Sequence, residues 1–278
     1  MLQPILSTHN EHPKDSNIQF FEEGHKYSIL SDPDSKYTSV TTWNHHHFPT
    51  FDADAVIQNM MKGKNWNESN KYWSMTPEEI KAQWTKNGQE VSGAGTLMHY
   101  QIECFMNNSE LPKGYTHADL LAHYNKNPLK EEDITPEWTY FLEFVRDYPD
   151  LKPYRTEWLI YDDEIKLAGS IDMVYENPDG TLMIYDWKRS KEITKINSWN
   201  KSAITECIQH LPDTNYWHYS LQLNTYKTIL ETKYNKKVTY LCLVKLHPNN
   251  PRKSYELLKV PFLEEELKDL CEYKKSLL

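Results

Sequence analysis

Two neighbouring apolar segments, each interrupted by one aspartate, constrain the fold of this 278-residue chain more than any other feature. Residues 169–175 contain Asp172, and residues 181–188 contain Asp186 and end at Lys188. The polar turn between them is centred on Asp179, which predicts an antiparallel strand pair with Asp172 directly opposite Asp186. Because side chains alternate along a strand, Lys188 shares the face of Asp186. The pattern therefore brings two carboxylates and one ammonium group together.

This arrangement is costly unless a cation accompanies it. Burying an unpaired carboxylate costs several kcal/mol, and a second carboxylate beside it raises the cost further. A divalent cation removes both penalties, and oxygen ligands favour Mg²⁺, with Mn²⁺ as a substitute. The alternative is an exposed strand end at which Asp186 and Lys188 pair weakly with their neighbours, as most surface charges do.

The remaining pattern predicts an α/β fold with one central mixed sheet flanked by helices. One or two hairpins are expected within residues 18–40. The expected helices cover a segment starting at residue 76, then 95–106, 135–148, 216–232 and 262–277. The expected strands cover residues 155–161, 166–176, 181–188, 237–246 and 255–260.

Two pairs of polar residues are spaced one helical turn apart. His99 and Glu103 project from the same face of the helix expected at 95–106, and Gln222 and Tyr226 do so in the helix expected at 216–232. Alone, each pair is a weak signal, because His99 could be a hydrogen-bonded core histidine and Tyr226 part of a buried stripe. Their order relative to the strands is more informative.

Together these segments resemble the ordered motifs of the PD-(D/E)XK nuclease superfamily. The segments are residues 95–99, Glu157, residues 169–172, residues 186–188 and residues 222–226. More narrowly, they resemble its RecB-like and lambda-exonuclease-like branch, which includes the mitochondrial genome maintenance exonuclease and exonucleases of large DNA viruses. Some members of that branch carry a cysteine cluster for an iron–sulfur group, which this sequence lacks.

The resemblance implies a role for each matching position. His99, Asp172, Asp186 and the backbone carbonyl of Trp187 would bind the metal ion. Lys188 would orient the attacking water and stabilise developing charge, while Glu157 would support the metal site. Gln222 and Tyr226 would hold the scissile strand or brace Lys188.

The implied function is a Mg²⁺-dependent DNA exonuclease that acts at the ends of linear DNA in replication, recombination or repair. Within the same fold, a structure-selective endonuclease or an RNA nuclease is an alternative. A catalytically inactive module that binds nucleic acid or a partner is another, although such a module has no need of the pair Asp172 and Asp186.

A net charge of −9 does not favour nucleic-acid binding as a whole, but charge acts locally. Basic residues gather after Lys188, with one aromatic residue among them. The candidate nucleic-acid-binding residues are Arg189, Lys191, Lys195, Trp199 and Lys201. The alternative is an ordinary solvated loop.

A single compact unit is expected, with a nuclease core in residues 91–278 and an N-terminal hairpin and helical elaboration in residues 1–90 that packs on this core. The aromatic residues of that elaboration could form an arch through which DNA threads, although aromatic residues more often belong to a core. They are Trp43, Phe48, Phe51, Trp66, Tyr72 and Trp73.

The four cysteines are widely spaced and predict free thiols in a reducing, intracellular compartment, the cytoplasm or the nucleus. No signal peptide or membrane-spanning segment is expected, and hence no membrane partner. The oligomeric state stays open.

Overall fold

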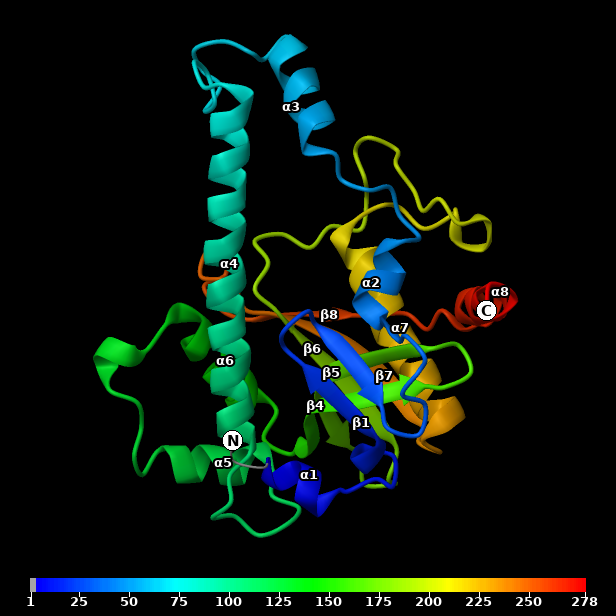
Figure 1. The fold of residues 1–278 in the computed structure, drawn as a ribbon. Coiled ribbons are helices and arrows are strands. Elements are labelled where there is room, and N and C mark those ends of the chain that lie inside the picture. Colours follow the sequence, from blue (N-terminus) through cyan, green and yellow to red (C-terminus); the bar gives the residue numbers. More distant parts are fainter. Residues whose placement is uncertain (1–3) are drawn as a thin grey trace. The chain divides into compact units, whose positions relative to one another are not determined.

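A computed structural model describes residues 4–278 and divides them into two compact units (Figure 1). The first unit combines the chain up to Pro49 with His99–Leu278, and the second is Thr50–Met98. The predicted domain boundary at residue 90 stays a prediction. Within the described residues, no helix is long and apolar enough to cross a membrane, and the four cysteines are free thiols.

A mixed sheet of six strands forms the centre of the first unit, as predicted. Its strands are β3 (Thr38–Ser39), β4 (Lys152–Asp162), β5 (Leu167–Glu176), β6 (Leu182–Lys188), β7 (Val238–Lys245) and β8 (Glu256–Lys259). β4, β5 and β6 form an antiparallel meander, β7 lies parallel to β6, and β8 lies antiparallel to β7. β3 pairs with β5 in parallel at the start of β5.

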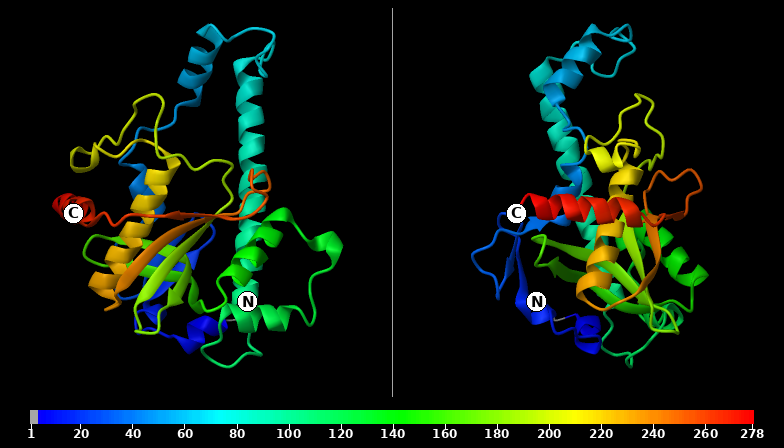
Figure 2. Two further views of the ribbon diagram at one scale, coloured as in Figure 1. Left: turned by 180° about the vertical axis from the view of Figure 1, so that it is seen from behind. Right: turned by 90° about the vertical axis from the view of Figure 1, so that its right-hand side faces the viewer.

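Helices cover both faces of this sheet (Figures 1 and 2). Ile184 of β6 packs in a core with α2 (Val40–His45), α7 (Asn215–Lys233) and α8 (Glu264–Ser276). The next side chain along the strand, Tyr185, points to the opposite face. There the ring of Tyr185 contacts Phe144 of α6 (Pro136–Asp147), beside α5 (His117–Tyr124).

The N-terminal segment forms one hairpin. It contains α1 (Ile5–His9), the 3-10 turn Asp15–Asn17 and the strands β1 (Ile18–Phe21) and β2 (Lys26–Ile29). The second turn predicted there does not close a hairpin, because β3 pairs with β5 in the main sheet instead.

The two helices predicted from residue 76 and at 95–106 are a single helix, α4 (Pro77–Met106). The predicted start is confirmed, because Thr76 Oγ1 accepts a hydrogen bond from the Glu79 backbone and the Glu79 carboxylate accepts one from the Thr76 backbone. The prediction of a break was wrong. A mid-helix glycine costs only about 1 kcal/mol, and good helix formers separate the glycines of this segment.

The second unit also contains α3 (Ala53–Lys62), which the sequence analysis missed. Aromatic residues of the second unit contact one another in pairs. Trp66 contacts Trp73, and Tyr72 contacts Trp84. Two residues assigned to the possible arch are core residues of the first unit instead, because Trp43 and Phe48 are buried against the sheet. The arch itself stays a prediction.

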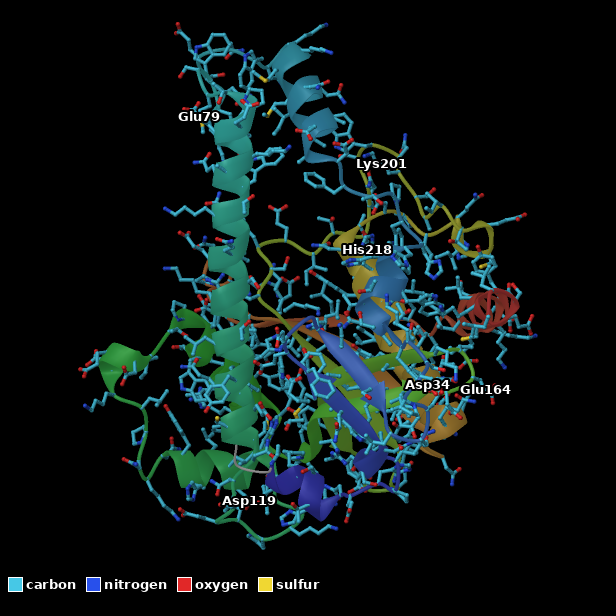
Figure 3. The ribbon with its side chains drawn as sticks, viewed as in Figure 1. Asp34, Glu79, Asp119, Glu164, Lys201 and His218 are labelled. Atoms are coloured by element: carbon cyan, nitrogen blue, oxygen red, sulfur yellow. The ribbon has the colours of Figure 1, made fainter. Side chains whose placement is uncertain are left out.

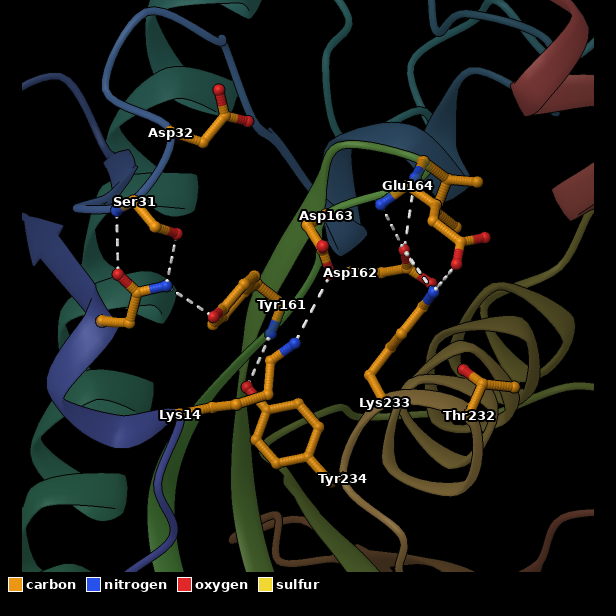
Figure 4. A network of polar contacts seen from close by, with 12 residues as sticks. Lys14, Ser31, Asp32, Tyr161, Asp162, Asp163, Glu164, Thr232, Lys233 and Tyr234 are labelled. Atoms are coloured by element: carbon orange, nitrogen blue, oxygen red, sulfur yellow. Dashed lines mark hydrogen bonds and ion pairs between the residues drawn. The ribbon is translucent and has the colours of Figure 1, made fainter.

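The C-terminal end of α7 forms ion pairs and a hydrogen bond with the end of β4 and the turn that follows it (Figure 4). Lys233 Nζ lies 2.5 Å from Glu164 and 3.6 Å from Asp162. The Tyr161 backbone N–H donates a hydrogen bond to Tyr234 Oη at 3.0 Å. These contacts fix the orientation of α7 on the sheet. The remaining elements are the 3-10 turns Glu131–Asp133 and Glu206–Ile208.

Candidate active site

The candidate site lies where β6 separates from β5. The ladder between these strands pairs Met173 with Tyr185 and Val174 with Ile184, which is the predicted register. The next opposed positions are Asp172 and Asp186, and there the ladder ends. Asp172 Oδ2 instead accepts a hydrogen bond from the backbone N–H of Trp187 at 3.0 Å. The two aspartates therefore face each other at an opening in the sheet.

Three potential ligand groups converge beside Asp172. One ligand atom from each of His99, Glu157 and Asp172 lies within 4.8 Å of the other two. His99 Nδ1 is 3.6 Å from Asp172 and 3.8 Å from Glu157, while its Nε2 donates to the carbonyl of Trp187 at 3.0 Å. α4, β4 and β5 each supply one of the three groups.

Glu157 has an unusual backbone conformation, with a φ of +41°. A non-glycine residue in the left-handed region costs about 1–3 kcal/mol and persists only where its surroundings enforce it. Here the Glu157 carboxylate accepts a hydrogen bond from Ser170 Oγ at 2.8 Å. The strained residue is therefore held with its side chain in the cluster.

Lys188 makes two contacts with groups that favour its charge. Its Nζ lies 2.7 Å from Asp186 Oδ2 and 4.4 Å from the ring centre of Tyr219 on α7. Asp186 is almost fully buried, at 2% side-chain exposure, and Lys188 is 17% exposed. The ammonium group is thus confined between a carboxylate and an aromatic face, which is a favourable place for a cation.

The ionisation of the site is set by burial and by its neighbouring charges. Burial would lower the pKa of His99, but Asp172 and Glu157 outweigh it and raise that pKa to about 9. Burial raises the pKa of Asp186 to about 6, although Lys188 acts in the opposite direction. Burial also raises the pKa of Asp172, with His99 opposing the shift. The raised pKa values of both aspartates mean that their negative charge is incompletely compensated.

Gln222 and Tyr226 lie together on α7, with Gln222 Nε2 donating to Tyr226 Oη at 3.0 Å. Tyr226 is buried against Gly169 of β5, where a Cβ atom would lie only 2.8 Å from Tyr226 Cε1. Glycine at 169 therefore allows Tyr226 of α7 to pack closely against β5.

The predicted nucleic-acid-binding residues divide into two groups. Arg189 is largely buried in an ion pair with Glu137 of α6, with Nε 2.7 Å from the carboxylate. Lys191, Lys195, Trp199 and Lys201 are exposed on the loop before α7, and Trp199 is 83% exposed. Figure 3 labels Lys201 on this loop.

Tyr219 is not among the site residues predicted from the sequence. The available signal was its position three residues before Gln222 and seven before Tyr226, which places all three on one helical face. Without the sheet in place, this spacing does not distinguish contact with Lys188 from ordinary core packing.

A mixed sheet with opposed carboxylates and a lysine at the end of a central strand is the arrangement expected of a PD-(D/E)XK nuclease. The sequence model described as "PD-(D/E)XK nuclease superfamily" matches residues 85–277, which is more than half of the chain. The chain belongs to this superfamily of metal-dependent nucleases. Comparison with curated proteins gives no match.

The donor set fits a divalent metal ion of the kind that this superfamily uses. Two carboxylates and, once its Nδ1 has lost its proton, one imidazole can each present a ligand atom within the 4.8 Å cluster. Asp186, predicted as a ligand, lies outside this cluster with its Oδ2 against Lys188, and its charge acts on His99. The incompletely compensated negative charge of the buried aspartates supports the same conclusion.

Proposed function

We propose that the protein is a Mg²⁺-dependent DNA exonuclease of the RecB-like and lambda-exonuclease-like branch, acting on linear DNA ends in replication, recombination or repair. The observation that carries the proposal is the convergence of His99, Glu157 and Asp172 beside the Asp186–Lys188 pair. Mn²⁺ is expected to substitute for Mg²⁺, because both favour oxygen-rich sites.

In this proposal His99, Asp172, Asp186 and the Trp187 carbonyl hold the ion, and Glu157 holds or supports it. When bound, the ion supplies positive charge that activates water and offsets charge in the transition state. Lys188 places a second positive charge beside the reacting phosphate and orients the attacking water. Gln222 and Tyr226 position the scissile strand, and the exposed basic loop contacts its phosphates.

Digestion of DNA substrates with and without free ends tests the proposal. The substrates are end-labelled linear and circular DNA, each single- and double-stranded, with Mg²⁺ or EDTA present. The wild-type protein is compared with Asp186→Ala and with the matched variant Asp150→Ala, which changes an exposed aspartate between α6 and β4. Metal-dependent loss of linear DNA alone is expected for wild type and Asp150→Ala.

Other outcomes of the digestion assay would change the proposed function. Cleavage of circles would make the protein an endonuclease, and cleavage of RNA alone would change the substrate. Binding without any cleavage would indicate an inactive module. Undiminished cleavage by Asp186→Ala would contradict the site assignment.

A further inference from the structure

A cavity of about 560 Å³ lies beside the first turn of α7, apart from the carboxylate cluster. Protein cavities that hold small molecules have volumes of about 300–1,000 Å³. Four aromatic residues and two lysines dominate its lining, namely Tyr216, Trp217, Tyr240, Phe262, Lys195 and Lys259.

The cavity combines aromatic surface with positive charge. Lys195 Nζ lies 4.6 Å from the ring centre of Tyr216, and Lys259 Nζ lies 5.7 Å from that of Tyr240. Among the described residues that line it, none is acidic. The cavity is therefore complementary to a ligand that is both planar and anionic.

Two of these aromatic residues donate their polar hydrogens to backbone carbonyls of residues that line the cavity. Tyr216 Oη donates to the Lys259 carbonyl at 2.9 Å, and Trp217 Nε1 donates to the Lys195 carbonyl at 3.1 Å. These bonds fix both side chains and leave their rings to make apolar contacts. Phe262 is 45% exposed and has no polar atom. Lys227 Nζ lies 4.9 Å from its ring centre and covers one face, so a base would stack on the other. Such a wall favours stacking over recognition of a particular base.

The cavity is close to the candidate active site along the chain and along α7. Tyr216 precedes Tyr219, whose ring contacts Lys188, by three residues, which is about 4.5 Å of helix rise. Lys195 lies on the loop that leaves β6 directly after Lys188. A strand held at Lys188 could therefore continue into the cavity.

We propose that this cavity binds an unpaired nucleotide of the substrate strand. The base stacks on the aromatic wall, chiefly on Phe262, and Lys195 and Lys259 contact the adjoining phosphates. This inference rests on the proposed nuclease function and narrows its substrate to nucleic acid with a single-stranded end.

Binding measured without cleavage tests the inference. Fluorescence anisotropy in EDTA compares a labelled single-stranded oligothymidylate with a blunt duplex. Phe262→Ala is expected to weaken single-strand binding by about 5- to 150-fold, the range for losing one stacked base. Lys259→Ala should weaken it and also reduce its salt dependence. Blunt-duplex binding should change little in either variant.

Two control variants separate stacking from misfolding. Phe262→Trp keeps an aromatic face and should keep the affinity of wild type. Phe21→Ala removes an equally exposed ring, at 51% exposure, from the N-terminal hairpin and should have no effect.

Unchanged single-strand binding in both Phe262→Ala and Lys259→Ala would overturn the inference, as would an equal loss for the blunt duplex. Competition between thymidine monophosphate and the oligonucleotide shows whether the cavity binds part of a strand or a free nucleotide. If it binds in a Phe262-dependent way yet does not compete with the oligonucleotide, the cavity is a nucleotide site and the strand assignment fails. Digestion assays report separately on the proposed function, which stands if wild type degrades DNA while these binding tests fail.

Discussion

Lys188 is the residue on which the proposed chemistry most depends. Lys188→Met removes the charge beside the reacting phosphate but leaves His99, Glu157 and Asp172 in place. Removal of one electrostatic contact to a transition state typically lowers kcat by about 10²–10³-fold, and a loss of this size is expected. Metal binding, measured by titration calorimetry, should be largely retained.

The control is Lys268→Met, which removes an exposed lysine from α8 and should keep nearly full turnover. Cleavage by Lys188→Met at the wild-type rate would refute the role given to this lysine.

Tyr219 is expected to act on the reaction through Lys188 as a positioning residue. Its ring face lies 4.4 Å from the ammonium group, a contact that contributes about 0.5–2 kcal/mol. Tyr219→Leu should therefore lower kcat by about 2- to 30-fold with little change in KM, whereas Tyr219→Phe keeps the ring and should restore the wild-type rate. Equal losses in the two variants would exclude the ring contact as the cause.

The burial of His117 predicts that the free energy of unfolding falls as the pH is lowered. Burial lowers the pKa of His117 from 6.5 to about 3, while Nε2 lies 2.9 Å from Tyr175 Oη. The unfolded chain therefore takes up this proton first, so the stabilisation present above pH 6.5 is lost as the pH falls towards 3, by up to about 1.4 kcal/mol per pH unit.

Urea unfolding of His117→Gln should show a shallower loss of stability between pH 6.5 and 5 than wild type does. His46→Gln, which changes an exposed histidine, should follow the wild-type curve. Parallel curves for His117→Gln and wild type would contradict the assignment.

At the residue scale, the sequence could predict which side chains lie together when the repeat of one helix or one hairpin decides it. The facing of Asp172 and Asp186 followed from the turn and from strand alternation, and the Gln222–Tyr226 pair followed from helical spacing. Contacts made between distant elements could not be predicted in this way. The pairing of Arg189 with Glu137 is one example, because it depends on how α6 packs against β6.

Among the elements, the contact between α7 and β5 makes the sharpest prediction. Gly169→Ala would place a Cβ 2.8 Å from Tyr226 and 3.3 Å from Val40, which should cost about 1–3 kcal/mol of stability in urea unfolding. The cost should be smaller in a Tyr226→Leu background, because the crowding ring is gone.

Gly88→Ala is the matched control for this change. A Cβ at Gly88 in exposed α4 meets nothing, so the substitution should stabilise the protein by about 0.5–1 kcal/mol. Stabilisation by Gly169→Ala as well would contradict the close approach of α7.

Elements with long periodic patterns were predicted, whereas shorter helices were missed even where a cap marks their start, as Asp52 does for α3. The three strands β4 to β6 and the Thr135 cap of α6 agree with expectation. α2 is only six residues long. Ser39 caps it, but its stability depends on burial of Val40 and Trp43, which so short a pattern does not predict. α5 did carry a usable signal, since Thr116 and Asp119 form a capping box.

For the whole molecule, ligand binding and stability are linked. Adding Mg²⁺ or Mn²⁺ to metal-free protein should raise Tm, with about 2.7 kcal/mol of stabilisation at a concentration 100 times Kd. Asp172→Asn should abolish the increase, while Asp34→Asn, on an exposed turn, should retain it. Calorimetric scans in EDTA and in metal check this, and an equal increase in Asp172→Asn would place the ion elsewhere.

The parallel pairing of β6 with β7 also determines when the site can exist. Asp186 lies opposite Leu243 and Lys188 opposite Lys245, and the whole of α7 separates these strands in the chain. Non-local parallel pairs form slowly, and during synthesis β7 leaves the ribosome well after β6. A nascent chain that already contains every residue of the site up to Tyr226 still lacks the strand that holds Asp186 and Lys188 in register. The carboxylate and the ammonium group of the site are thus held in register only once β7 has joined the sheet.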